Sequence, residues 1–246
     1  MSFSLPDPCS AKAVNYSKRP GRPRAEPGFG RFWPVDRNNL WCERVKYGLR
    51  FPTDTPVEQW DAFAAGQIEV QDHASQLAIG VVAAQPGETV VDLCAGAGGK
   101  TLGLAADMDN KGRLVACDVS RERLARLAPR AERAGALGIE TLLLDGGREA
   151  RALAPLMGKA DAVLVDAPCS GSGTWRRSPE GRWRLNPAEL ARLTALQARV
   201  LGLGSGLVRS GAPAGIESLS HREHQVFRLL ISGRTVTPGR FSTGTT

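Results

Sequence analysis

The chain has 246 residues, of which 42% are hydrophobic, 23% are charged and five are cysteines. That length and composition fit one main domain with a sizeable core, and exclude a collagen-like or wholly disordered chain. The formal net charge of +7 at pH 7 suits a polyanionic partner, because each lysine or arginine that contacts a phosphate releases counterions.

No run of 18 or more apolar residues occurs, and the first 30 residues lack the apolar core of a signal peptide. We therefore expect a cytoplasmic protein without a membrane span. The five cysteines are widely separated, without a C-x-x-C pair, and the chain has only three histidines. This spacing predicts neither a disulfide framework nor a metal site.

Residues 1–57 are rich in Arg, Pro and Gly and follow neither a helical nor a strand period, as in SKRPGRPRAEPGFGRFWPVDR. We predict an irregular basic N-terminal arm, and for its SKRPGRPR segment a disordered tail is favoured over an RNA contact. A folded domain is predicted over residues 58–246, divergent after about residue 210. It opens with a short amphipathic piece and a turn, and then a helix that Pro86 and Gly87 stop.

Four apolar runs bounded by turns come next: TVVDLC, GRLVACD, ETLLLD and ADAVLVD. Helical candidates lie between them at residues 101–108, 121–134 and 148–156, and Pro129 should kink or shorten the second. Apolar strands that alternate with helices are typical of a parallel sheet covered on both faces. The predicted fold is therefore α/β, with an open, mostly parallel sheet and right-handed crossovers.

The first of these strands leads into a glycine-rich loop, VVDLCAGAGGKT, which fits neither of two nucleotide-binding patterns. A triphosphate-binding loop needs glycine at the position of Cys94, and a dinucleotide-binding loop needs glycine or alanine at the position of Thr101. The pattern that remains is a strand ending in Asp92, then glycines, then a helix, which lets a ligand lie against the main chain. The alternative is a glycine-rich turn without a ligand.

Each of the next three apolar runs also ends in an aspartate, at Asp118, Asp145 and Asp166. A single aspartate there is more often a helix cap or a turn residue, but four on one edge of a sheet favour a ligand site. Asp118 lies about 20 residues after the glycines, the spacing at which an acid binds ribose hydroxyls. An adenosine without a triphosphate loop predicts S-adenosylmethionine, whose cationic sulfonium suits a pocket rich in carboxylates and poor in lysine.

The fourth strand end, DAPCSGSGTWRR, brings a carboxylate, a proline and a thiol together. Carbon 5 of cytosine becomes reactive when a thiolate adds at carbon 6 and an acid engages the ring nitrogen. We predict that Asp166 supplies the acid, and that Cys169 serves as the nucleophile or in breakdown of the adduct. Cys94 and Cys117 are predicted to be small buried hydrophobes, which is also the alternative for Cys169.

Residues 59–209 resemble the Fmu/Sun (RsmB-like) family of S-adenosylmethionine-dependent RNA cytosine-5 methyltransferases, most closely in VVDLCAGAGGKT, ACDVSRERLARL, DAPCSGSGTWRRSPEGRWR and LARLTALQARVLGLGSGLVRSG. DAPCSGSGT is highly specific to the family, whereas the glycine loop alone is not. The resemblance implies a Rossmann-like methyltransferase fold that acts on RNA, with ribosomal RNA favoured. In such proteins the cysteine of the PC pair, here Cys169, helps release the methylated product, and another cysteine, in a TCS motif, is the nucleophile. The cofactor-binding residues that the resemblance implies are Cys94, Ala95, Gly96, Ala97, Gly98, Gly99, Lys100, Asp118, Asp145 and Asp166.

The chain departs from the family pattern near its C-terminal end, because it has no cysteine after Cys169. The stretch ESLSHREHQV resembles the segment on the C-terminal side of the family's nucleophile, which aligns Glu217 with that cysteine. A carboxylate cannot supply the soft addition that carbon 6 needs. The strand before Glu217 carries Pro213 and Gly215, so the C-terminal strands of the sheet are expected to be incomplete.

Basic side chains alternate with two tryptophans in WRRSPEGRWR. We predict RNA binding here, with the arginines on phosphates and the tryptophans stacked on bases. The alternative is a solvated loop whose tryptophans pack on the domain. The predicted RNA-binding residues are Arg176, Arg177, Arg182 and Arg184.

These patterns leave two classes of function. In the first, the chain is an RNA cytosine-5 methyltransferase that uses S-adenosylmethionine. In the second, it binds the cofactor and RNA but transfers methyl groups very slowly or not at all, because the second cysteine is missing. A nucleoside triphosphatase is a distant third, disfavoured by Cys94 in the glycine loop.

Overall fold

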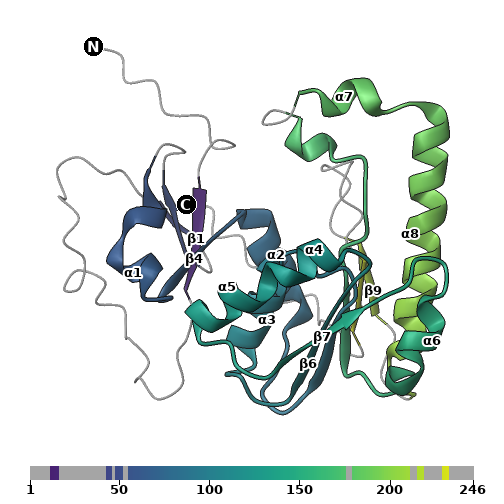
Figure 1. The fold of residues 1–246 in the computed structure, drawn as a ribbon, viewed down its shortest axis with the longest axis horizontal. Coiled ribbons are helices and arrows are strands. Elements are labelled where there is room, and N and C mark those ends of the chain that lie inside the picture. The colour runs from purple at the N-terminus through teal and green to yellow at the C-terminus, as the bar shows by residue number, and fades with distance from the viewer. Residues whose placement is uncertain are drawn as a thin grey trace, which may run out of the picture.

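The computed structural model describes residues 12–16, 43–45, 48–51, 55–175, 179–210, 215–218 and 229–232. They form two β-sheets, and most of the helices pack around the larger sheet (Figure 1). The strands are β1 (Lys12–Tyr16), β2 (Glu43–Val45), β3 (Gly48–Phe51), β4 (Ile68–Gln71), β5 (Thr89–Asp92), β6 (Arg113–Asp118), β7 (Ile139–Leu143), β8 (Ala162–Val165), β9 (Gly215–Ser218) and β10 (Leu229–Ser232). The α-helices are α1 (Asp61–Ala64), α2 (His73–Val82), α3 (Gly99–Asp107), α4 (Arg121–Ala125), α5 (Leu127–Ala134), α6 (Glu149–Leu153), α7 (Gly181–Arg184) and α8 (Pro187–Leu207), and short 3₁₀ helices are η2 (Val57–Gln59), η3 (Ala154–Leu156) and η4 (Ser172–Thr174).

The larger sheet has the strand order β7-β6-β5-β8-β10-β9. Its four strands β7, β6, β5 and β8 are the four predicted apolar runs, and they pair in parallel. The predicted α/β fold with an open, mostly parallel sheet is confirmed. Strand β7 lies at one edge of the sheet and is partly exposed, unlike the buried strands β5 and β8.

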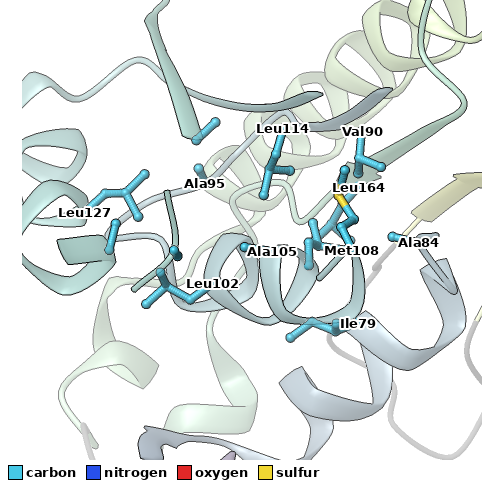
Figure 2. Packing of buried hydrophobic residues seen from close by; sticks show 14 of the residues in the cluster. Ile79, Ala84, Val90, Ala95, Leu102, Ala105, Met108, Leu114, Leu127 and Leu164 are labelled. Carbon is cyan, nitrogen blue, oxygen red and sulfur yellow. The ribbon is translucent and has the colours of Figure 1, made fainter. Parts of the chain in front are cut away.

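The two faces of this sheet bury different helices, because successive side chains of a strand point to opposite faces. Val90, Leu114 and Leu164 belong to a buried cluster with residues of α2, α3 and α5, shown in Figure 2. Val91 and Val163 belong to a second cluster, with residues of α6 and α8. In Figure 1, α2, α3 and α5 accordingly lie on one side of the sheet, and α6 and α8 lie on the other.

Local sequence explains where the predicted helices begin and end. The Asp72 side chain accepts hydrogen bonds from the first turn of α2 and caps it, and Ala83 in the left-handed conformation (φ 51°) ends it. The helix predicted over residues 121–134 is divided at Arg126 into α4 and α5. Pro129 lies in the first turn of α5, where its missing N–H is tolerated, so the expected interruption is confirmed.

The smaller sheet was not predicted. Its order is β2-β3-β1-β4, and all three pairings are antiparallel. Strands β1, β2 and β3 lie within residues 1–57, where irregular chain was expected, and β4 lies where a turn was expected. These strands are only three to five residues long, so their pairing depends on partners distant in sequence rather than on a local period. The division of the chain at residue 57 stays a prediction.

The C-terminal strands reverse the direction of the larger sheet. β10 pairs antiparallel with β8, and β9 pairs antiparallel with β10 at the edge. Each has only four residues, so the strand expected before Glu217 is short, as predicted. Leu230 of β10 lies opposite both Leu164 of β8 and Glu217 of β9. Glu217 is therefore two strands away from β8.

Among the helices of the described ranges, none combines the length and the apolar character that crossing a membrane requires.

Candidate cofactor and catalytic site

The predicted acids lie at the carboxyl ends of four adjacent parallel strands. Asp92 and Asp118 are the last residues of β5 and β6, and Asp166 comes directly after β8. Asp145 comes two residues after the end of β7 and is exposed. Because these strands run in parallel in the order β7-β6-β5-β8, the four residues share one edge of the sheet, where open α/β sheets bind their ligands.

The glycine-rich loop between β5 and α3 contains two glycines in the left-handed region, Gly96 (φ 57°) and Gly98 (φ 84°). A Cβ atom on Gly98 would lie 2.1 Å from Cδ1 of Leu127, so this glycine allows α5 to pack closely on the loop. A Cβ atom on Gly96 would meet nothing within 4 Å. The main chain at Gly96 is thus open on the side where a side chain would stand.

Asp118 holds the loop through its carboxylate. Its Oδ2 accepts a hydrogen bond from the Gly96 N–H at 2.8 Å, and its Oδ1 accepts one from the Ser120 N–H at 2.7 Å. Arg123 forms an ion pair with Oδ1 at 2.9 Å, and the Asp118 side chain is 3% exposed. A carboxylate offers about four acceptor positions, and three are engaged here. The observed role of Asp118 is to fix the loop, and its predicted contact with a ribose stays a prediction.

Asp92 is buried beneath the loop. Its Oδ2 accepts a hydrogen bond from the Thr101 hydroxyl at 2.7 Å, while its Oδ1 has no hydrogen-bond partner among the described residues. Burial is the main cause that raises the pKa of Asp92 to about 6, and the charge of Asp166 adds to the shift. The Thr101 hydrogen bond and the charge of Lys100 act in the opposite direction. Asp92 is therefore a carboxyl group that titrates just below neutral pH.

Lys100 and Asp166 form an ion pair across this edge of the sheet. The ammonium of Lys100, in the first turn of α3, donates to Oδ2 of Asp166, and the two side chains are 15% and 24% exposed. An edge poor in lysine was expected, but Lys100 lies among its acids. Its charge compensates the carboxylate that was predicted to engage the base.

The three described cysteines divide into two kinds. Cys117 is buried in β6, and Cys94 is half-buried at the start of the loop. Burial, with the nearby charges of Asp92 and Asp118, raises the pKa of each thiol to about 12, so both stay protonated at neutral pH. The burial of Cys117 agrees with its interpretation as a small buried hydrophobe, whereas Cys94 lies after β5 and is only half-buried.

Cys169 lies in the turn after β8 and is half-buried. The carbonyl of the preceding Pro168 accepts a hydrogen bond from the Gln197 side chain at 3.0 Å. Gln197 belongs to α8, so this long helix holds the turn that presents the thiol. The structure thus brings Cys169 and Asp166 to the same edge as the glycine loop.

The predicted RNA-binding arginines are only partly described. Arg176 and Arg177 lie outside the described residues, while Arg182 and Arg184 belong to α7, and Arg184 is exposed. Trp183, between them, is 87% exposed. Trp175 instead is half-buried and packs near Gly181. Trp183 is therefore free to stack on a base, as predicted, whereas Trp175 packs on the domain, as the alternative had it.

Sequence reasoning missed three residues of the site. Val119 is 52% exposed immediately after Asp118, so an apolar side chain is accessible at the ligand edge. Gln71 and Arg130 hydrogen-bond to the main chain of the glycine loop from 28 and 33 residues away. Only the apolar character of Val119 beside an acid could have been noticed in the sequence, because the other two contacts depend on the fold.

The parallel sheet, the glycine-rich loop and the acids at successive strand ends define the Rossmann-type fold of S-adenosylmethionine-dependent methyltransferases. The family model of the 16S rRNA methyltransferase RsmB/F matches residues 79–213. The chain belongs to this family.

Individual relatives agree with this assignment. The probable ribosomal RNA small subunit methyltransferase B of Synechocystis sp. is 38% identical over 165 residues, which cover 67% of this chain and 36% of that protein. The crystal structure of PH0851 is 32% identical with a TM-score of 0.70, over 84% of this chain and 45% of that one. A methyltransferase homolog protein from Pyrococcus horikoshii is 26% identical with a TM-score of 0.58, over 71% and 54% of the two chains. The chain therefore spans well under two thirds of the length of these relatives.

Proposed function

We propose that this chain is an S-adenosylmethionine-dependent methyltransferase that acts on carbon 5 of cytosine in ribosomal RNA. The observation that carries the proposal is the placement of Cys169 and Asp166 at the same sheet edge as the glycine loop and Asp118. Membership in the 16S rRNA methyltransferase family, and a relative named as a ribosomal RNA methyltransferase, support the choice of substrate.

The residues at the edge fit this cofactor. The open side of Gly96 lets a ligand approach the main chain, and the first-turn N–H groups of α3 have no side-chain cap. Asp92 keeps one buried oxygen without a partner among the described residues, and carboxylates suit a cationic sulfonium. The residues that would hold the cofactor are Cys94, Ala95, Gly96, Ala97, Gly98, Gly99, Lys100, Asp118, Asp145 and Asp166.

The bound cofactor supplies an electrophilic methyl group. Asp166 engages the ring nitrogen of the cytosine through a proton held between the carboxyl group and that nitrogen, and Lys100 holds the carboxyl group in place. Cys169 helps release the product after methylation, and the hydrogen bond from Gln197 of α8 to the Pro168 carbonyl, which holds its turn, supports this role. Arg182, Arg184 and Trp183 on α7 offer charges for phosphates and an exposed aromatic face for a base.

Two assays test the proposal. Calorimetry with S-adenosylhomocysteine should show 1:1 binding, and tritiated S-adenosylmethionine should label unmodified ribosomal RNA at carbon 5 of cytosine. A chain that binds ATP but not S-adenosylhomocysteine would refute the cofactor assignment.

A second candidate function is binding of the cofactor and RNA with impaired transfer. It is favoured by the sequence after Cys169, which contains no cysteine, and by the position of Glu217 on β9, with β10 between that strand and β8. Labelling of RNA that is absent or very slow, together with intact binding of both ligands, would distinguish this candidate from the first.

A further inference from the structure

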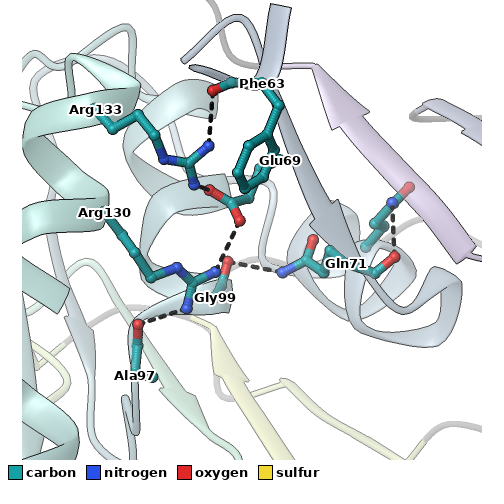
Figure 3. Close-up of polar contacts among 8 residues, drawn as sticks. Phe63, Glu69, Gln71, Ala97, Gly99, Arg130 and Arg133 are labelled. Carbon is teal, nitrogen blue, oxygen red and sulfur yellow. Dashed lines mark hydrogen bonds and ion pairs between the residues drawn. The ribbon is translucent and has the colours of Figure 1, made fainter. Parts of the chain in front are cut away.

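The glycine loop is held from outside its own strand and helix. The carbonyl of Ala97 accepts a hydrogen bond from Nη1 of Arg130 at 2.7 Å, and the carbonyl of Gly99 accepts one from Nε2 of Gln71 at 2.7 Å (Figure 3). Arg130 belongs to α5, and Gln71 is the last residue of β4 in the smaller sheet. Two carbonyls of the loop, two residues apart, are therefore fixed by two other parts of the fold.

A buried carboxylate connects these parts. The carboxylate of Glu69, on β4, accepts from both arginines: one oxygen lies 3.2 Å from Nη2 of Arg130, and the other lies 2.5 Å from Nη2 of Arg133. The Glu69 side chain is 11% exposed. Arg133 also donates to the Phe63 carbonyl at 2.9 Å and lies 3.8 Å above the centre of the Phe63 ring. Hydrogen bonds between ionised groups are stronger than neutral ones, and burial reduces their screening by salt. Glu69 therefore fixes the guanidinium that reaches the loop.

Holding a carbonyl also orients the next N–H group, because the peptide unit is planar. The Ala97 carbonyl shares its plane with the N–H of Gly98, and the Gly99 carbonyl shares its plane with the N–H of Lys100. Lys100 lies in the first turn of α3, whose N–H groups have no acceptors within the helix. The Gly98 N–H donates to the Ala95 carbonyl at 2.9 Å, so Arg130 holds the peptide unit that closes the turn of the loop, while Gln71 sets the direction of the Lys100 N–H at the start of α3.

We propose that Arg130 and Gln71, with Glu69 holding Arg130, are positioning residues that keep the glycine loop in its cofactor-binding conformation. This inference rests on the proposed function, because it concerns the same cofactor. It makes the smaller sheet part of the binding site, although β4 lies before the segment that matches the family model. A loop ordered in advance binds more tightly, since the ligand does not have to order it.

The matched pair Arg130 and Arg133 tests the proposal. Both arginines lie on α5 and bind Glu69, and their other hydrogen bonds differ: Arg130 donates to the Ala97 carbonyl of the loop, whereas Arg133 donates to the Phe63 carbonyl. Arg130→Ala should weaken S-adenosylhomocysteine binding about 10-fold, the effect of losing one charge-assisted hydrogen bond. Arg133→Ala should lower the melting temperature at least as much but change the Kd less than about two-fold. Arg130→Lys should recover only part of the affinity, because one ammonium cannot serve Ala97 and Glu69 as a guanidinium fork does.

A variant at Gln71 tests the same inference without relying on the stability of the Arg130→Ala protein. Gln71→Ala should weaken binding about three-fold or more, whereas Gln85→Ala, which removes a hydrogen bond between an exposed side chain and the Ala83 carbonyl, should leave the Kd unchanged. If the unaltered chain binds S-adenosylhomocysteine and both Arg130→Ala and Gln71→Ala bind it equally well, the inference is wrong while the proposed function stands. If the unaltered chain does not bind it, the proposed function itself fails, and the inference with it.

Discussion

The cofactor edge and the C-terminal strands of the larger sheet differ in how much of the family's machinery they keep. At the cofactor edge, parallel strands place Asp92, Asp118 and Asp166 side by side, and each carboxylate has a partner within the chain. At the C-terminal side, β10 runs antiparallel beside β8 and separates it from the strand of Glu217. The contrast predicts that the two proposed activities, cofactor binding and methyl transfer, can be separated by experiment.

The largest expected effect concerns methyl transfer. Under the second candidate function, the unaltered chain binds cofactor but transfers methyl groups to RNA very slowly or not at all, because no thiolate is available on the strand of Glu217. Replacing this segment by a family-like strand, with cysteine in place of Glu217, should raise the rate about 100-fold or more, the range typical of a catalytic group. The measurement is tritiated methyl transfer to unmodified ribosomal RNA, with trapping on 5-fluorocytosine RNA.

The contrast between the cofactor edge and the C-terminal strands would be wrong if the unaltered chain methylated RNA rapidly and Cys169→Ala abolished that methylation. Cys169 would then be the nucleophile, and the C-terminal strands would not be needed for transfer.

The next effect concerns the acid that holds the glycine loop. Asp118→Ala removes the acceptor of the Gly96 and Ser120 N–H groups and the ion-pair partner of Arg123, so S-adenosylhomocysteine binding should weaken about 10- to 100-fold. Calorimetry measures the change.

Asp161→Ala is the matched control. Asp161 also accepts a main-chain hydrogen bond, from Thr89, and pairs with Arg209, but it precedes β8 at the opposite end of the strand. It should lower thermal stability without changing the Kd. Equal affinity losses in Asp118→Ala and Asp161→Ala would attribute the effect to stability alone.

Asp92 provides a smaller effect that depends on pH. Its pKa is raised from 3.8 to about 6, so the folded state binds this proton more tightly than the unfolded state does. This contribution to stability is fully present below pH 4 and is lost as pH rises to about 6, by up to about 3 kcal/mol at roughly 1.4 kcal/mol for each pKa unit. Asp92→Asn should remove the decline, which urea unfolding between pH 4 and pH 8 would measure. If the free energy of unfolding of Asp92→Asn declines with pH as that of the unaltered chain does, other titrating groups cause the decline.

The smallest effect concerns the arginines of α7. If Arg182 and Arg184 contact phosphates of single-stranded RNA, each Arg→Ala change should reduce the slope of log affinity against log salt by about 0.7. Arg113, at the start of β6 and paired with Glu140, is a control whose replacement should leave the slope unchanged. Identical slopes for all variants would leave α7 as a solvated helix.

Much of the cofactor edge could be predicted because its determinants are local. Each strand is a short apolar run that ends in an acid, and the glycines and Pro129 restrict the backbone within a few residues. Parallel pairing is then expected from the alternation of strands with helices, which is why the placement of Asp118 and Asp166 on one edge could be inferred.

The partners of these acids could not be predicted in the same way. The pairing of Lys100 with Asp166 joins residues 66 positions apart, and nothing in either segment specifies the other. The titration of Asp92 near pH 6 depends on burial, which only the packed fold produces.

The sequence by itself determined the α/β class, the glycine loop, the row of acids and the lack of a cysteine after Cys169, because each of these is a matter of residue type and short spacing. Only the tertiary structure decided that β4 joins a second sheet, that Gln71 and Arg130 hold the loop, and that β10 lies between β8 and β9. Strands this short gain their stability from pairing and burial against distant segments, so their position depends on the whole fold.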